Sequence, residues 1–183
     1  MSVFRVSYRY ANSLMQLAVE KNIYQKVAGD ADLVFNSLNQ SKEIKAVLKS
    51  PVIKTDLKKN LLKEIFSNKI SKEVQSFIDF VIQKNREDIL IDIFKEFLVL
   101  CDKKDGILRA NVKTAVEIDE SLKNKIKEKL ETKTKQRVFA NYSIDPKLIG
   151  GFIVEVEDQV FDASIKHKLK LLRKKFSEEI SIN

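Results

Sequence analysis

The sequence is poor in residues that interrupt or cross-link a chain. Its 183 residues include four glycines, two prolines and one cysteine. Because Gly and Pro mark turns, their scarcity predicts long helices and argues against an all-β sandwich or a disordered chain. The single Cys101 cannot close an intrachain disulfide, so nothing points to an oxidising compartment. A chain of this length suits one large domain or two small ones, and it can fold without disulfides or metal.

Residues that usually carry chemistry are equally scarce. One His and one Cys exclude a His/Cys zinc site, and the glycine-rich phosphate loops and the H-E-x-x-H motif are missing. His167 lies between two lysines and is predicted on a helix surface, whereas Cys101 falls on an apolar row and is predicted in the core. Asp158 and Asp162 flank a short predicted strand, where turn and helix-cap roles are expected. We predict no catalytic residue, no metal site and no cofactor.

Long apolar runs are missing too. The longest uncharged run, Tyr10 to Val19, has ten residues, fewer than the roughly 20 that a membrane-spanning helix requires. The net charge is +8, and the basic excess is shared by both halves of the chain, with its densest stretch at 166–175. Arg5 and Arg9 precede the first acid, as in a presequence, but the pattern continues into the next helix. We therefore expect a folded domain of a cytoplasmic, bacterial-type protein.

Residues 1–105 show helical periodicity throughout. In the first helix, at about 4–21, Phe4, Tyr8, Ala11, Met15 and Ala18 form one apolar row. Further helices are predicted at about 23–38, 41–48, 55–66, 71–82 and 88–101. Ser41 is the predicted N-cap of the third helix, Thr55 or Asp56 is predicted to cap the fourth, and Ser71 is predicted to begin the fifth. Short connections between such helices are typical of a bundle.

After Gly106 the apolar period changes from 3.6 to 2. Alternating residues predict a strand over 108–116, and a lysine-rich helix follows at about 119–131. Strands are expected at 138–144, 152–156 and 160–161, with Gly150-Gly151 forming a tight turn into the sheet. The closing helix carries the apolar stripe Ile165, Leu169, Leu172 and Phe176. The predicted fold is therefore mainly α, with a six-helix bundle over 1–105 and a small α/β domain over 106–183.

The first helix has more apolar surface than one row requires. Tyr10, Leu14 and Leu17 form a second row beside the first, and Phe80 is similarly displaced on the fifth helix. If these two helices lie side by side, they leave a groove into which another amphipathic helix could dock. A central helix buried within its own bundle would give the same periodicity. The residue pattern leaves both arrangements open.

Three segments of the chain resemble one known family. Residues 148–169, LIGGFIVEVEDQVFDASIKHKL, place a glycine pair before a strand, then an acidic turn and D-x-S leading into a basic helix. This resembles the signature of the delta subunit family of rotary F-type ATP synthases, whose mitochondrial counterpart is the oligomycin-sensitivity-conferring protein. The opening YRYANSLMQLAVEKN and the stretch NREDILIDIFKEFLVLCDKKDGILRANVKTA resemble that family's first helix and domain junction. The matching signature residues are Gly150, Gly151, Asp158, Val160, Asp162, Ser164 and Leu169.

Two positions depart from the family pattern. Glu157 stands where the family usually has Gly before the acid, and Ala163 stands where it often has Gly after the second Asp. Both lie in predicted turns, so they affect local geometry. The resemblance still covers nearly the whole chain, with its segments in the right order.

The resemblance implies a non-catalytic stator subunit. In this family the N-terminal bundle sits on the catalytic alpha/beta head and grips an N-terminal helix of an alpha subunit. The C-terminal domain contacts the b subunits of the peripheral stalk. The head is thereby held against torque, so that proton flow drives ATP synthesis. The resemblance also implies a peripheral position at the cytoplasmic face of the bacterial plasma (inner) membrane, with membrane contact only through the complex.

These implications lead to specific expectations for binding. We predict that a charge at Leu14 weakens alpha binding and leaves the bundle folded. The closing helix is expected to contact the stalk, unless its stripe packs on the domain's own sheet. The residues predicted to bind alpha are Tyr10, Leu14, Leu17, Phe77, Phe80 and Val81.

Two other classes of function remain to be weighed. The +8 charge would suit a basic helical nucleic-acid-binding protein, although the aromatic and basic strand pattern of a stacking platform is missing. An enzyme is a more distant alternative, because no group of residues supports catalysis. We therefore predict that the protein is a stator component and that it does not bind nucleic acid.

Overall fold

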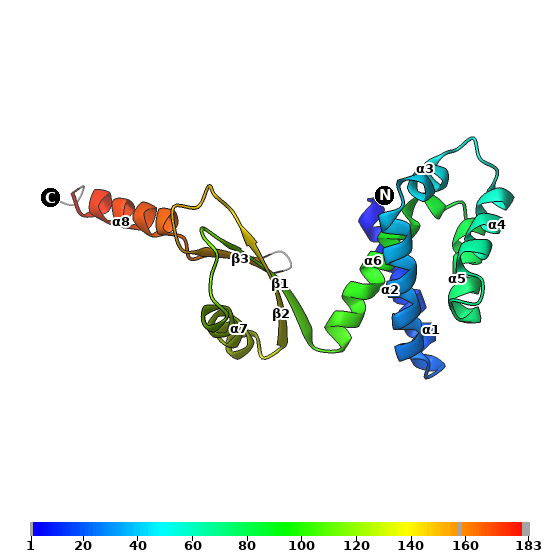
Figure 1. Ribbon diagram of the computed structural model, residues 1–183, viewed down its shortest axis with the longest axis horizontal. Helices are drawn as coiled ribbons and strands as arrows, with labels where there is room; N and C mark the ends of the chain where they lie inside the picture. Colours follow the sequence, from blue (N-terminus) through cyan, green and yellow to red (C-terminus); the bar gives the residue numbers. More distant parts are fainter. Residues whose placement is uncertain (1, 157–158, 181–183) are drawn as a thin grey trace. The chain divides into compact units, whose positions relative to one another are not determined.

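The computed structural model describes residues 2–156 and 159–180, and the side chains of 175–180 lie outside this description. The chain forms two compact units, Met1–Cys101 and Asp102–Asn183 (Figure 1). The first is helical and the second combines helices with a small mixed sheet. The predicted fold class, a helical bundle followed by a small α/β domain, is confirmed.

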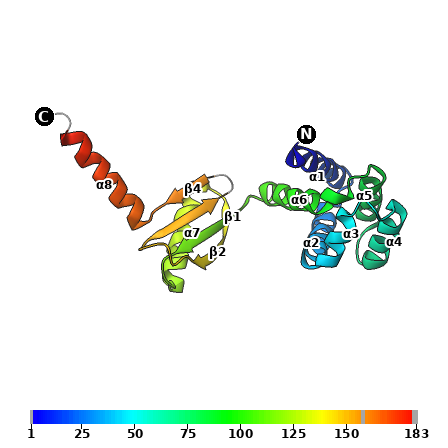
Figure 2. The same ribbon diagram turned by 90° about the horizontal axis from the view of Figure 1, so that it is seen from above.

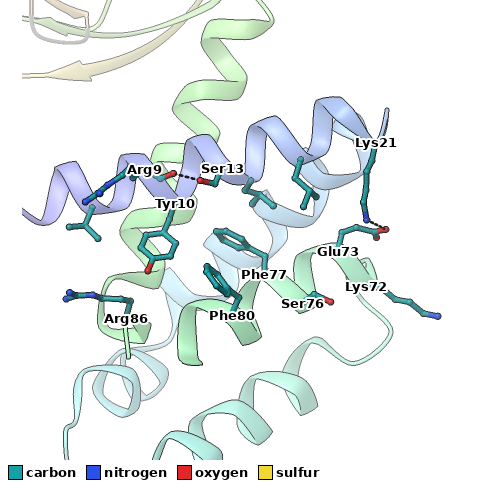
Figure 3. A pocket seen from close by; sticks show the side chains of 13 residues that line it. Arg9, Tyr10, Ser13, Lys21, Lys72, Glu73, Ser76, Phe77, Phe80 and Arg86 are labelled. Carbon is teal, nitrogen blue, oxygen red and sulfur yellow. Dashed lines mark hydrogen bonds and ion pairs between the residues drawn. The ribbon is translucent and has the colours of Figure 1, made fainter. Parts of the chain in front are cut away.

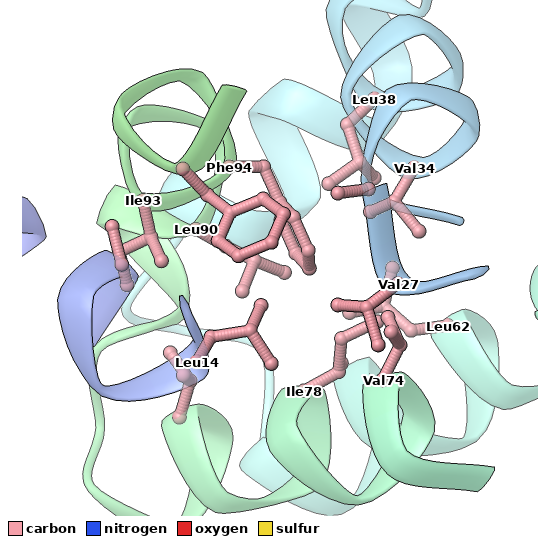
Figure 4. Packing of buried hydrophobic residues seen from close by; sticks show 14 of the residues in the cluster. Leu14, Val27, Val34, Leu38, Leu62, Val74, Ile78, Leu90, Ile93 and Phe94 are labelled. Carbon is pink, nitrogen blue, oxygen red and sulfur yellow. The ribbon is translucent and has the colours of Figure 1, made fainter. Parts of the chain in front are cut away.

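The first unit is a bundle whose apolar helix faces share one core. Figure 4 shows Leu14 of α1, Ile78 of α5 and Phe94 of α6 converging there, and all three are essentially inaccessible to solvent. Burying such side chains is the main force that holds helices of this length together. The elements are α1 (Val3–Glu20), α2 (Tyr24–Gln40), α3 (Lys42–Lys49), α4 (Thr55–Phe66), α5 (Lys72–Gln83), the 3-10 turn η1 (Glu87–Ile89) and α6 (Leu90–Lys104).

The buried face of α1 differs from the predicted row. Phe4 and Tyr8 are 60% and 44% exposed, whereas Leu14 is 1% exposed and belongs to the core. The core row has the helical spacing 4, 3, 4 and includes small side chains, which allow α1 to approach its neighbours closely. The predicted row was only partly right, since Ala11 and Ala18 are buried but Phe4 and Tyr8 are not, because periodicity does not show which of two adjacent faces meets the bundle. The buried residues of α1 are Ser7, Ala11, Leu14 and Ala18.

The predicted helix starts are only partly right. The Ser41 side chain accepts a hydrogen bond from the Ile44 N–H, as expected of an N-cap. Helix α4 begins at Thr55, at the predicted position, but the predicted cap was wrong, because the N-cap residue is Lys54 and no side chain caps the helix. Ser71 precedes α5, but its backbone N–H donates to the Asp30 carboxylate of α2 at 2.8 Å. That bond joins residues 41 positions apart and fixes the start of α5 against α2.

The second unit is built on a sheet with strand order β2-β1-β3-β4 (Figure 2). β1 and β2 run parallel and are connected through α7, whereas β3 pairs antiparallel with both β1 and β4. Alternate residues of the sheet meet Ile126 and Leu130 of α7 in a second core. The elements are β1 (Ile107–Thr114), α7 (Glu120–Thr134), β2 (Arg137–Ile144), β3 (Phe152–Val156), β4 (Gln159–Asp162) and α8 (Ile165–Ile180).

The Gly150-Gly151 turn lies where β3 begins, against the start of α8. Gly151 has a φ of +81°, and a Cβ atom there would lie 2.5 Å from the carbonyl oxygen of Ala163. A Cβ at Gly150 would meet only the end of the Ile165 side chain, at 2.6 Å. The tight turn was predicted. The close approach of the Ala163 carbonyl is a second reason why position 151 requires glycine.

Candidate docking groove between α1 and α5

A groove of about 1030 Å³ lies between α1 and α5. Figure 3 shows Tyr10 extending from α1 toward Phe77 and Phe80 of α5. The rings of Tyr10 and Phe80 are tilted against each other with their centroids 6.2 Å apart. Leu17 and Phe80 are 38% and 45% exposed, so apolar surface remains open to solvent along both walls. An apolar groove between two helices is a typical binding site for an amphipathic helix.

Five of the six residues predicted for this site line the groove. Tyr10, Leu17, Phe77 and Phe80 form its walls, and Leu14 lies at its base, where it also contributes to the core. Val81 does not line the groove. It is fully buried in the core because it follows Phe80 by about 100° of helical turn. The expectation for a charge at Leu14 also changes, since a charge in a buried position would destabilise the bundle itself.

Charged residues at the rim of the groove did not appear in the sequence-based prediction. Figure 3 shows Arg9 and Arg86 at one end, and Lys21, Lys72 and Glu73 at the other. Lys21 pairs with Glu73 at 3.7 Å. The sequence does contain a pattern that could have identified these rim residues, namely a spacing of four positions, which places side chains on one edge of a helix. On α1 that edge is Arg9, Ser13, Leu17 and Lys21, and on α5 it is Lys72, Ser76 and Phe80.

The second unit has its own exposed apolar surface on α8. Ile165, Leu169 and Leu172 of the predicted stripe are 44%, 49% and 49% exposed, so the sheet of this unit does not cover them. The fourth residue of the stripe, Phe176, has a side chain outside the described residues. Lysines 166, 168 and 170 are also exposed on the same helix. This part of α8 is amphipathic and remains open to a partner.

Residues of the predicted family signature shape the start of α8. The Asp162 carboxylate accepts a hydrogen bond from the Ser164 N–H at 2.9 Å, and the Ser164 hydroxyl accepts one from the His167 N–H at 3.2 Å. Bonds to the Ser164 hydroxyl and backbone N–H lower the pKa of the Asp162 carboxyl. The turn role expected of Asp162 is confirmed, but the side chain that caps α8 is that of Ser164, so the predicted cap role of Asp162 was wrong. Asp158 lies outside the described residues. His167 is half-exposed, and its Nδ1 lies 3.9 Å from Asp162.

Features that would indicate a metal site or a membrane span are absent from the described residues. Over residues 2–156 and 159–180, no group of three His, Cys, Asp or Glu side chains is placed to hold a metal ion. Within the same ranges, no helix is both long and apolar enough to cross a bilayer. Cys101 is buried at the end of α6, as predicted for a core residue.

The fold is that of a two-unit protein, in which a helical bundle with an open apolar groove precedes an α/β unit with an exposed amphipathic helix. Sequence comparison gives the family directly. The sequence profile described as "ATP synthase delta (OSCP) subunit" matches residues 6–176, and the chain belongs to that family. Its relatives confirm the prediction of a stator component that associates with other ATP synthase subunits, and they do not support a nucleic-acid-binding protein.

Individual relatives agree with this assignment. The ATP synthase subunit delta of Chloroherpeton thalassium is 35% identical over 172 residues, covering 94% of each chain. That of Chlorobaculum tepidum is 36% identical and covers 94% of this chain and 96% of its own. A chain in the cryo-EM structure of the Toxoplasma gondii mitochondrial ATP synthase hexamer has the same fold, with a TM-score of 0.74 at 21% identity. That match covers 93% of this chain and 96% of the other.

Proposed function

We propose that the α1/α5 groove binds the N-terminal helix of an ATP synthase alpha subunit and so attaches this protein to the alpha/beta catalytic head. The observation that carries this proposal is the open apolar surface of Leu17 and Phe80 on facing walls of the groove. Burial of about 100 Å² of such surface contributes on the order of 2.5 kcal/mol, before the entropy of ordering the partner is subtracted. Tyr10 and Phe77 add aromatic surface with little conformational freedom to lose.

We further propose that residues 106–183 contact the b subunits of the peripheral stalk through α8. The exposed row of Ile165, Leu169 and Leu172 supports this role. The two contacts would hold the head against torque while the central rotor turns. The stalk would keep the protein at the cytoplasmic face of the bacterial plasma membrane, and the bacterial origin of the relatives supports that location.

The head contact can be tested with a labelled synthetic peptide of the alpha subunit's N-terminal segment, titrated with the full chain. Phe80→Asp and Leu17→Asp place a charge on the groove walls and should raise Kd by roughly tenfold or more. Leu57→Asp is the matched control, because Leu57 is 60% exposed on α4 and does not line the groove. Equal affinities for wild type, Phe80→Asp and Leu57→Asp would contradict the proposed site.

The stalk contact needs a separate experiment. Leu169→Asp combined with Leu172→Asp should abolish co-purification of the b subunits and leave recovery of alpha and beta unchanged. Val116→Asp serves as the control, since Val116 is 67% exposed and lies outside α8. If the double variant retains the b subunits, α8 is not the contact.

A further inference from the structure

The charges around the α1/α5 groove are strongly unbalanced. Four of its lining residues are cationic, namely Arg9, Lys21, Lys72 and Arg86, and one is anionic, namely Glu73. Glu73 already pairs with Lys21 at 3.7 Å. The Nζ of Lys84, next to the groove, lies 5.5 Å from the centroid of the Phe80 ring and adds further positive charge. An occupant of this groove therefore meets an apolar strip with cations at both ends.

This arrangement favours one sign of charge in the occupant. Docking removes water from the rim, and a cation brought close to Arg86 or Lys72 would be repelled in a medium of lower dielectric constant. A neutral occupant would partly desolvate Arg86 and Lys72 and offer them no counter-charge. Carboxylates compensate for that loss, and guanidinium groups bind them in a two-pronged geometry.

The spacing of the cations also limits the length of the occupant. Arg9 on α1 and Lys21, the residue that follows α1 and caps its C-terminal end, lie twelve positions apart, which corresponds to about 18 Å along the helix axis. A docked helix of about twelve residues, between three and four turns, spans that distance. Its first and last turns would then lie beside the two groups of cations shown at opposite ends of the groove in Figure 3.

We propose that the groove selects an acidic amphipathic helix, with Arg86 receiving carboxylates at one end and Lys72 receiving them at the other. The inference rests on the proposed binding of the alpha subunit's N-terminal helix and adds the chemistry that this helix must present. Arg86 and Lys72 are specificity residues in this arrangement, whereas Leu17 and Phe80 supply apolar contact.

The test uses the full chain and two probes, the alpha N-terminal peptide and the same peptide with its Asp and Glu residues replaced by Asn and Gln. Arg86→Glu and Lys72→Glu should each weaken binding of the first peptide roughly 2- to 10-fold at low salt. The difference should shrink between about 50 and 500 mM salt, because rim charges are screened. The amidated peptide should bind weakly to the wild type and be insensitive to both variants. Lys42→Glu, in the first turn of α3 and outside the groove, should behave as wild type.

The outcomes separate this inference from the proposed function. Unchanged affinity in Arg86→Glu and Lys72→Glu, with Phe80→Asp still impaired, would overturn the charge selection and leave the apolar site in place. Equal affinity for the two peptides would overturn it as well. Failure of the wild type to bind the first peptide would overturn both. Circular dichroism of each variant shows whether the bundle remains folded.

Discussion

The Nζ atom of Lys58 lies 2.8 Å from Oε1 of Glu87 inside the bundle, where the two residues are 3% and 9% exposed. The same ammonium donates a hydrogen bond to the carbonyl oxygen of Leu48 at 3.0 Å. Lys58 therefore links the first turn of α4 to the C-terminal end of α3 and to η1. The other carboxylate oxygen of Glu87, Oε2, is buried and has no hydrogen-bond partner.

Removal of one member of this pair is expected to be costly. Lys58→Met leaves the Glu87 carboxylate buried without its counter-charge, and the free energy of unfolding should fall by about 3–5 kcal/mol. Urea unfolding followed by circular dichroism measures this change. The double variant Lys58→Met with Glu87→Leu should recover much of the loss, since it buries no charge.

A control for this prediction lies next to it on the same helix. Lys59 pairs with Asp79 at 3.6 Å, but its side chain is 27% exposed. Lys59→Met should therefore cost no more than about 1 kcal/mol. Equal losses in the two single variants would show that burial does not determine the importance of the Lys58 pair.

Leu14 and Leu17 of α1 should respond differently to the same substitution. Leu14 is 1% exposed in the core, so Leu14→Ala should lower the free energy of unfolding by about 2–5 kcal/mol. Leu17 is 38% exposed on the groove wall, and Leu17→Ala should change stability by less than about 0.5 kcal/mol. Thermal unfolding measures the first effect, and titration with the alpha peptide measures the weaker binding of the second. A large loss of stability in Leu17→Ala would contradict this division.

Two glycines are expected to give opposite effects when replaced by alanine. Gly29 lies within α2 with nothing within 4 Å of an added Cβ, so Gly29→Ala should stabilise the protein by about 0.5–1 kcal/mol. Gly151→Ala forces a left-handed conformation and a clash with the Ala163 carbonyl, and it should cost at least about 1–2 kcal/mol. Gly106, with a φ of +64° and free space around it, is the control for the conformational cost alone. A Gly151→Ala effect no larger than that of Gly106→Ala would show that the carbonyl can move aside.

The start of α8 should depend on acid pH. Hydrogen bonds from Ser164 hold the pKa of the folded Asp162 carboxyl below its ordinary value. The ionised carboxylate therefore stabilises the folded turn above the unfolded pKa of about 4, and this contribution is lost as pH falls through the lower folded pKa. NMR titration of the Ser164 amide should show this transition in the wild type. Asp162→Ala should abolish this transition and make the first turn of α8 less stable at neutral pH. An unchanged titration in that variant would exclude Asp162 as the source of the transition.

Periodicity and spacing in the sequence were enough to predict the fold class and the succession of helices and strands. The 3.6-residue period before Gly106 and the two-residue period after it follow from how each backbone alternates its side chains, so they can be read without tertiary structure. The Ser41 cap and the Asp162 turn were also predictable, because both are local hydrogen bonds.

Only the tertiary structure decided which surfaces remain open. Leu14 and Leu17 are both apolar residues of α1 that line the groove, yet Leu14 is buried at its base and Leu17 is exposed on its wall, because neighbouring helices cover only part of the apolar face. The Lys58–Glu87 pair and the Asp30–Ser71 bond join residues 29 and 41 positions apart, a separation at which sequence spacing carries no geometric information. The cations at the two ends of the groove come from α1, from α5 and from the residues that follow each of these helices. Their shared surface exists only because the bundle packs α1 beside α5.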